Sequence, residues 1–118
     1  MRIDDTGNVG IGTTNPGTYK LAVNGEIRAK EVIVETGCSD FVFEEHYALR
    51  PLNEVEAFIK ANKHLPDIPS EKEVSENGLG LGEMQAKLLR KVEELTLYMI
   101  EMKKENQALR QRIVNLEN

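Results

Sequence analysis

The side chains best suited to catalysis or metal binding in this sequence are one cysteine and two histidines, and their surroundings argue against both roles. Cys38 stands close to Asp40 and Glu44, whose negative charge disfavours the thiolate form that a reactive cysteine needs. His46 and His64 lie far apart in the chain, and no second cysteine is present to complete a metal site. Threefold symmetry could gather three copies of one histidine on an axis, but the His-x-His spacing of such sites is missing. We therefore predict a buried structural cysteine, no metal and no cofactor.

The glycine-rich string near the N-terminus does not have the pattern of a phosphate-binding loop. Gly7, Gly10 and Gly12 are not followed by the Gly-Lys-Ser/Thr that opens the helix of a P-loop. A dinucleotide-binding loop would place its third glycine at the start of a helix, and no helix is predicted there. These glycines therefore predict turns and close backbone packing.

The composition excludes several classes of protein. The 118 residues include no Trp and only three Phe and three Tyr, so the large side chains that usually anchor a core are scarce. A net charge of −5 disfavours binding to nucleic acid or to an anionic membrane. No run of about 18 apolar residues exists, so we predict no membrane insertion. The N-terminus lacks the apolar core of a signal peptide and begins within a repeating pattern, as expected of a piece of a longer protein.

Three regions are expected along the chain: a β-rich stalk end over 1–36, a small α/β knob over 37–80 and a coiled-coil helix over 81–118. In the first region, alternating apolar residues over 21–23 and 27–29 flank Asn24-Gly25, the strongest short-range signal for a β-hairpin. Residues 32, 33 and 34 are all apolar, so a strand there would have apolar side chains on both faces. This pattern indicates burial on both faces or a bulge. Strands this short need partners, and identical neighbouring chains are the economical source.

The second region holds most of the aromatic residues. Residues 40–43 predict a short strand, and Arg50-Pro51 predicts a break in the regular secondary structure. Apolar residues at helical spacing then predict a helix that stops near Leu65-Pro66. The expected knob core consists of Phe41, Phe43, Val55, Phe58 and Ile59.

A second, shorter helix is expected after Pro66. Ser70 with Glu73 has the spacing of a capping box, which opens a helix, and Asn77-Gly78 would close it.

The third region carries the clearest signal, a heptad repeat of about five heptads without Pro. The d positions are Leu81, Leu88, Leu95, Met102, Leu109 and Leu116, and the a positions are Gln85, Val92, Met99, Asn106 and Ile113. Gln85 and Asn106 are interpreted as register-setting polar residues, with an axial ion or water site as the weaker alternative. A helix packed on its own globule would show a wider apolar face.

Charged residues beside the repeat indicate a parallel arrangement. In a parallel coiled coil, each g residue faces the e residue five positions later on the neighbouring helix, so Glu105 meets Arg110 and Arg112 meets Glu117. Val or Ile at a with Leu at d favours a dimer. The string from Arg112 to Glu117, with Ile113 at a and Leu116 at d, resembles the Arg-h-x-x-h-Glu trimerisation motif (h apolar). We therefore predict a homotrimer over a dimer. A coil folded back along the knob, burying the face of Leu89, Thr96 and Lys103, stays an alternative to an extended coil.

The string Gly7 to Pro16, GNVGIGTTNP, followed by Leu21 to Ala29, LAVNGEIRA, resembles a segment common near the ends of bacterial surface proteins and phage tail fibres, including secreted proteins of the Bacteroides group. In those proteins the segment is part of an intertwined three-stranded β stalk. The remainder, from Ser39 onward, resembles a shortened intramolecular chaperone domain of tail spikes and endosialidases. The resemblance implies an α+β fibrous homotrimer with short intertwined strands, a small α/β knob and a parallel three-stranded coiled coil.

Members of that chaperone family often cleave themselves. There, the serine of a Ser-Asp pair attacks the bond before it, assisted by a lysine five residues on. Ser39-Asp40 matches the pair, but Glu44 stands where the lysine is expected, and a carboxylate is a weak base. The resemblance therefore implies no enzymatic activity, with Ser39 the catalytic residue only if cleavage occurs. Otherwise Ser39-Asp40 caps or turns the backbone.

Taken together, these patterns predict a structural trimerisation and assembly module at the C-terminal end of a tail fibre or surface adhesin. Its expected location is an extracellular surface or a virion tail fibre, and its expected partner is itself. One alternative is a receptor-binding fibre tip that contacts a cell-surface protein or glycan, which the low aromatic content disfavours. The other alternative is the self-cleaving chaperone.

Overall fold

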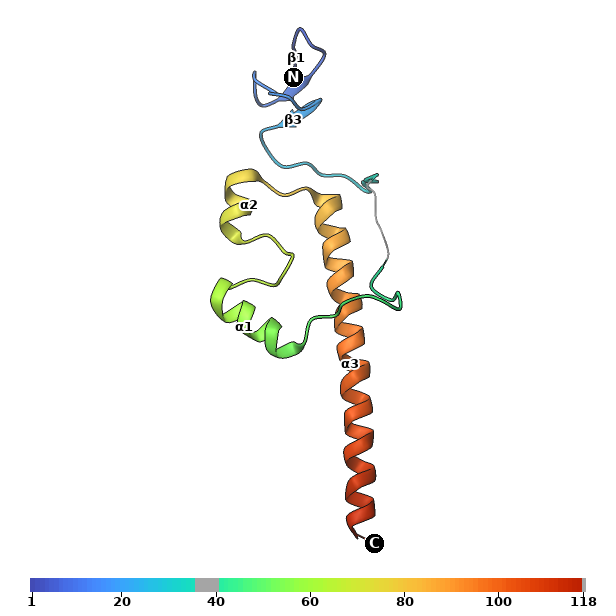
Figure 1. The fold of residues 1–118 in the computed structure, drawn as a ribbon. Coiled ribbons are helices and arrows are strands. Elements are labelled where there is room, and N and C mark those ends of the chain that lie inside the picture. Colours follow the sequence, from blue (N-terminus) through green and yellow to red (C-terminus); the bar gives the residue numbers. More distant parts are fainter. Residues whose placement is uncertain (36–40, 118) are drawn as a thin grey trace. The chain divides into compact units, whose positions relative to one another are not determined.

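The computed structural model describes residues 1–35 and 41–117, and the chain divides into two compact units, 1–33 and 34–118 (Figure 1). The first unit is a small sheet, and the second is made of helices and turns. The elements are β1 (Arg2–Ile3), β2 (Val9–Ile11), β3 (Leu21–Val23), α1 (Leu52–Asn62), α2 (Glu71–Asn77) and α3 (Leu81–Glu117). The predicted Cys38 and Ser39 features lie outside the described residues.

The sheet of the first unit has the strand order β1–β2–β3. β1 is antiparallel to β2, whereas β2 is parallel to β3, with Val9 opposite Leu21 and Ile11 opposite Val23. The strands are only two or three residues long. Sheets of such short strands are marginal in water, so hydrogen bonds from the loops contribute a large share of their order.

Two loop side chains supply those bonds. The Asp4 carboxylate accepts hydrogen bonds from the Thr6 hydroxyl at 2.7 Å and from the backbone N–H groups of Thr6 and Asn8 at 2.9 Å each. These bonds, the Thr6 hydroxyl first, lower the pKa of Asp4. Asn8 is buried and donates from Nδ2 to the Gly17 carbonyl oxygen at 3.2 Å. Both loops between the strands are thereby tied to the sheet.

The predicted hairpin at Asn24-Gly25 is wrong. A type I′ turn requires positive φ at both central residues, and Asn24 does not have it. Instead, the Asn24 backbone N–H donates to the Ile11 carbonyl oxygen at 2.8 Å, and its Nδ2 donates to the Gly12 carbonyl oxygen at 3.3 Å. Asn24 therefore extends the parallel pairing of β2 with β3, and residues 26–35 form no strand.

Gly12 permits this parallel pairing. Its φ is 72°, a region that residues with a side chain rarely adopt, and a Cβ there would lie 2.8 Å from the Asn24 carbonyl oxygen. The residues 32–34 predicted to be buried are exposed in the single chain.

The predicted strand at 40–43 is also wrong over its described part, because residues 41–47 form turns. The backbone N–H of Glu44 donates to the Phe41 carbonyl oxygen at 3.2 Å, and that of Tyr47 donates to the Glu44 carbonyl oxygen at 3.1 Å. These local bonds use the groups that a strand would offer to a neighbour. The described residues 41–80 contain helices and turns, so the knob is helical there instead of α/β.

Both short helices begin where their sequences predict, and α2 also ends there, whereas α1 ends at Asn62, before the predicted stop near Leu65-Pro66. The Ser70 hydroxyl accepts from the Glu73 backbone N–H at 3.2 Å while the Glu73 carboxylate accepts from Ser70, so the capping box is confirmed. Gly78 closes α2 with a φ of 75° and a 2.8 Å bond to the Val74 carbonyl oxygen. In α1 the closing residue is Lys63, in the left-handed region at φ 62°.

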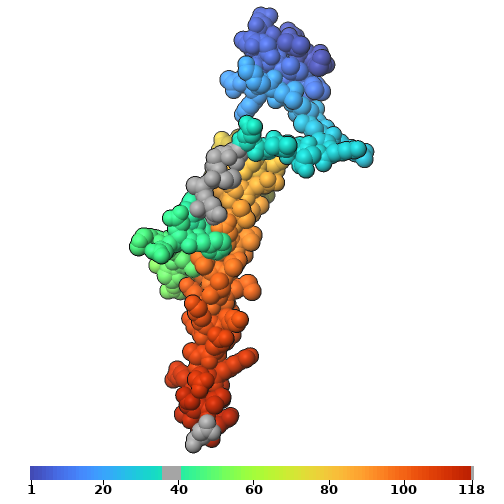
Figure 2. Space-filling view, turned by 90° about the vertical axis from the view of Figure 1, so that its right-hand side faces the viewer, coloured from blue at the N-terminus to red at the C-terminus, as the bar shows by residue number. Residues whose placement is uncertain are grey.

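α3 is one uninterrupted helix of 37 residues, as predicted. At 1.5 Å per residue its length is about 55 Å. Its N-terminal half has other segments of the second unit beside it. Beyond Tyr98, no other described segment of the chain lies against it (Figures 1 and 2).

Candidate self-association interface

The a and d residues of α3 form a largely apolar stripe, interrupted by the polar Gln85 and Asn106, that is exposed in the single chain; we call it the seam. Its residues are Leu81, Gln85, Leu88, Val92, Leu95, Met99, Met102, Asn106, Leu109, Ile113 and Leu116, flanked near the C-terminus by Arg112 and Glu117. Every one of these residues is exposed. Among the apolar members, exposure ranges from 48% for Leu88 to 86% for Leu116. Burial of one such side chain stabilises by about 1.5–3 kcal/mol, so the seam is a large unused driving force for association.

The knob contacts a different face of α3. Tyr98, at a g position, is buried and donates from its hydroxyl to the Arg50 carbonyl oxygen at 2.6 Å. Glu94, at a c position, is also buried and accepts from the Tyr47 hydroxyl at 3.1 Å. Both contacts come from the segment before α1. Leu95, at d, lines a small cavity with Leu52 and Val55 of the knob but stays 60% exposed. The knob therefore touches one edge of the seam and leaves most of it open.

A network of charges joins the knob to this face. Lys91 Nζ lies 3.3 Å from Glu94 Oε1 and 3.4 Å from Asp67 Oδ2. Asp67 also lies 3.9 Å from the Arg50 guanidinium. Burial, and then the charge and hydrogen bond of the Glu94 carboxylate, raise the pKa of Tyr47. Burial followed by the charge of Glu94 raises the pKa of Tyr98 in the same way.

Stacking contacts complete the attachment of the knob. The Arg90 guanidinium lies 4.6 Å from the centre of the Phe41 ring, within the range of a cation–π interaction. Phe41 also packs against Tyr47, with ring centres 5.7 Å apart. The T-shaped pair of Phe58 and His64, 5.3 Å apart, lies on the α1 side of the knob.

The predicted knob core is only partly found in the single chain. Phe41, Val55 and Phe58 are half-buried, whereas Ile59 is exposed. Phe43 is 59% exposed and is not a core residue there, because the turn at 41–44 directs Val42 inward instead.

The sequence patterns did not identify the buried or paired roles of Val42, Lys91, Glu94 and Tyr98. Tyr98 offered one usable signal, since a large aromatic residue at g stands outside the seam and needs another surface to cover it.

The other predicted sites have little structural support. Ser39 lies outside the described residues, and Glu44 is an exposed turn residue. Within residues 1–35 and 41–117, no group of three or more His, Cys, Asp or Glu side chains is arranged to hold a metal ion. No helix in that part of the chain is both long and apolar enough to cross a membrane.

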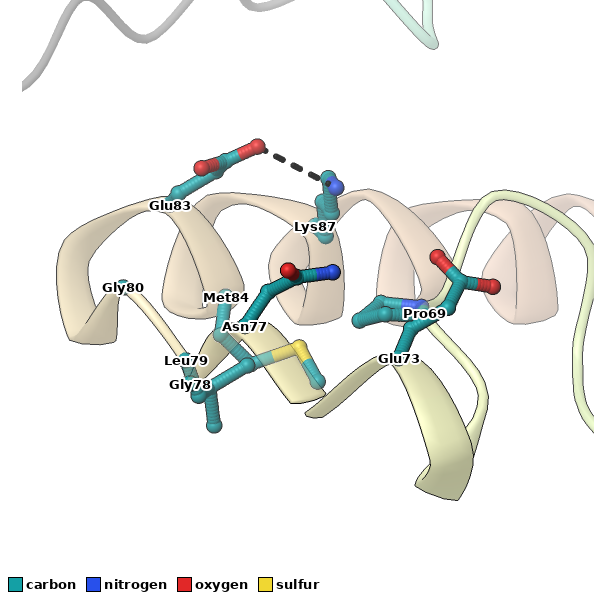
Figure 3. Close-up of a pocket in the computed structure, with 9 residues that line it drawn as sticks. All are labelled: Pro69, Glu73, Asn77, Gly78, Leu79, Gly80, Glu83, Met84 and Lys87. Atoms are coloured by element: carbon teal, nitrogen blue, oxygen red, sulfur yellow. Dashed lines mark ion pairs between the residues drawn. The ribbon is translucent and has the colours of Figure 1, made fainter. Parts of the chain in front are cut away.

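A cavity of about 150 Å³ lies at the elbow between α2 and α3, the segment 77–80 (Figure 3). Met84 points from α3 toward this elbow, and Pro69 lines the opposite side. The half-buried Lys87 and the exposed Glu83, 3.2 Å apart, form its outer edge. Met84 stands at a g position and therefore lies between this cavity and the seam.

Comparison with known proteins found no matching family model, no matching curated protein and no matching solved structure. The exposed seam is accordingly the main guide to function.

Proposed function

We propose that this chain is a structural self-association module. The seam of α3 pairs with the seams of two further copies in a parallel three-stranded coiled coil, which holds together the C-terminal end of a surface fibre or tail fibre. The observation that carries this proposal is the seam itself: a largely apolar stripe along the length of a 37-residue helix, exposed in the single chain. A soluble chain rarely leaves so long an apolar stripe without a partner.

Charge complementarity supports the parallel arrangement. Glu105, Arg110, Arg112 and Glu117 are exposed, and within the described chain none of them forms an ion pair. In a parallel coil they pair between chains as Glu105 with Arg110 and Arg112 with Glu117. Each exposed pair contributes about 0.2–1 kcal/mol, so these pairs select orientation more than they add stability.

The width of the open face supports three strands over two. A helix in a trimer touches two neighbours and buries a wider arc of its surface than a helix in a dimer. In α3 the e residue Leu89 is exposed beside Leu88 and Val92, so the apolar face there extends beyond a and d. The string from Arg112 to Glu117 agrees with the trimerisation motif.

Association through α3 would promote strand pairing between the N-terminal units of the three chains. The three short strands of each unit leave Ile3, Ile11 and Leu21 exposed, and a sheet of this size is marginal alone. A coiled coil that holds three chains together raises the effective concentration of these strands for one another. Pairing with the correct stagger then costs less chain entropy.

The test compares two substitutions in the part of α3 beyond the knob. Leu109 lies in the seam at d and is 53% exposed, whereas Val114 lies at b and is 48% exposed. Because no other described segment touches either residue, Glu at either position leaves the single chain intact. We expect Leu109→Glu to reduce the mass in light scattering to one chain, while Val114→Glu keeps the trimer. Equal effects of the two substitutions would exclude the seam as the interface.

A further inference from the structure

The apolar face of α3 is widest at its N-terminal end, where Leu89 adds an e residue to the seam. Leu89 is 57% exposed in the single chain. The heptad seam alone does not require a leucine at this position. The N-terminal half of α3 runs along the knob of its own chain, but the hydrogen bonds between them fall on c and g residues. The face of Leu89, Thr96 and Lys103 that a folded-back coil would bury is exposed in the single chain.

The residue that faces Leu89 in a parallel coil is Met84. A g residue meets the e residue five positions later on the neighbouring helix, and Met84 and Leu89 have that spacing. Met84 is half-buried and lies against the elbow between α2 and α3 (Figure 3). Leu79 in that elbow is 48% exposed, so it adds apolar surface beside Met84.

The other g residues of the N-terminal half are already occupied by the knob of their own chain. Lys91 is paired with Asp67 and Glu94, and Tyr98 donates to the Arg50 carbonyl oxygen. Among the described g residues near the knob, Met84 is the one whose apolar surface matches an apolar e residue of a neighbour. At the opposite end of the helix, the g and e residues are charged.

We propose that Leu89 of one chain packs against Met84 and Leu79 of a neighbouring copy. We call this contact between an α2–α3 elbow and the next helix the clasp. This inference rests on the proposed parallel coiled coil and adds a second contact outside the seam. The knob is then part of the interface. An apolar clasp beside the knob and ion pairs at the far end fix the stagger of the chains from both ends of α3.

The experiment uses the full chain and a matched pair of substitutions, Leu89→Gln and Ile100→Gln. Ile100 lies at b and is 46% exposed, so both variants replace an exposed apolar residue of α3 by the same amide. Light scattering of the wild type comes first, followed by the trimer dissociation constant from thermal unfolding at several protein concentrations. Because each of the three clasps buries only part of the Leu89 side chain, we expect Leu89→Gln to raise this constant about ten- to hundredfold in total, while Ile100→Gln changes it less than about threefold.

A double-mutant cycle with Met84→Ala identifies the partner of Leu89. If the two side chains touch across the interface, Leu89→Gln has a much smaller effect in the Met84→Ala background. Full additivity, or equal effects of Leu89→Gln and Ile100→Gln in an intact trimer, would overturn the clasp and leave the coiled coil standing. A wild type that is monomeric would overturn the proposed function and the clasp together.

Discussion

The hydroxyl of Tyr98 donates a 2.6 Å hydrogen bond to the backbone carbonyl oxygen of Arg50, and so joins α3 to a segment 48 residues earlier in the chain. Tyr98 is only 7% exposed. This bond places the knob on the g side of α3. Most of the seam stays open because the knob packs mainly on the c and g positions of α3 and little on the a and d positions.

Removal of this hydroxyl weakens the attachment of the knob. Tyr98→Phe leaves the Arg50 carbonyl oxygen without its donor, and we expect a loss of about 1–2 kcal/mol in the free energy of unfolding, measured with denaturant. Tyr19→Phe is the matched control, since Tyr19 is 69% exposed and should change stability by less than about 0.5 kcal/mol. Equal losses in the two variants would contradict the role of Tyr98.

Stability is expected to fall at alkaline pH. The folded pKa values of Tyr47 and Tyr98 lie above the ordinary value of 10.0, so the folded chain retains protons that the unfolded chain has released. Their contribution is therefore complete below pH 10 and is lost as the pH rises through the raised values. Melting temperatures between about pH 8 and 11.5 should decline, and less steeply in Tyr98→Phe. An identical decline in wild type and variant would disagree with a raised pKa for Tyr98.

Lys91 neutralises a buried carboxylate. Its side chain and that of Glu94 are only 12% and 10% exposed, so Lys91→Met leaves the Glu94 charge without its cation. We expect a loss of about 2–3 kcal/mol in the free energy of unfolding. Lys87→Met breaks the more exposed pair with Glu83 and should cost less than about 1 kcal/mol. A similar cost for both would mean that the network adds no more than a surface ion pair.

The orientation of the helices can be tested by exchanging charges. Arg112→Glu should lower the melting temperature of the assembly, because it places like charges opposite Glu117 of a neighbouring chain in a parallel coil. Adding Glu117→Arg should restore much of the loss. The two residues are five positions apart on one helix and do not face each other within a chain, so rescue requires a contact between chains. Absence of rescue would argue against the parallel register.

The sequence predicted the elements that local chemistry determines. The capping box of Ser70 and Glu73, the closing Gly78 and the uninterrupted heptad helix are confirmed, because each depends on residues within a few positions of one another. The hairpin at Asn24-Gly25 failed because a parallel neighbour took the hydrogen-bonding groups of Asn24. The strand at 40–43 failed because turn bonds used the carbonyl oxygens of Phe41 and Glu44.

The network of Tyr47, Asp67, Lys91 and Glu94 could not be predicted, since its members are brought together only by tertiary structure. Exposure of the seam likewise depends on tertiary structure, because it follows from the attachment of the knob to the c and g positions of α3.

The most direct measurement of the central claim is the mass of the intact chain by light scattering over a range of concentrations. We predict three times the 13.3 kDa of a single chain. A chain that stays monomeric at high concentration, with its seam exposed, would contradict the account.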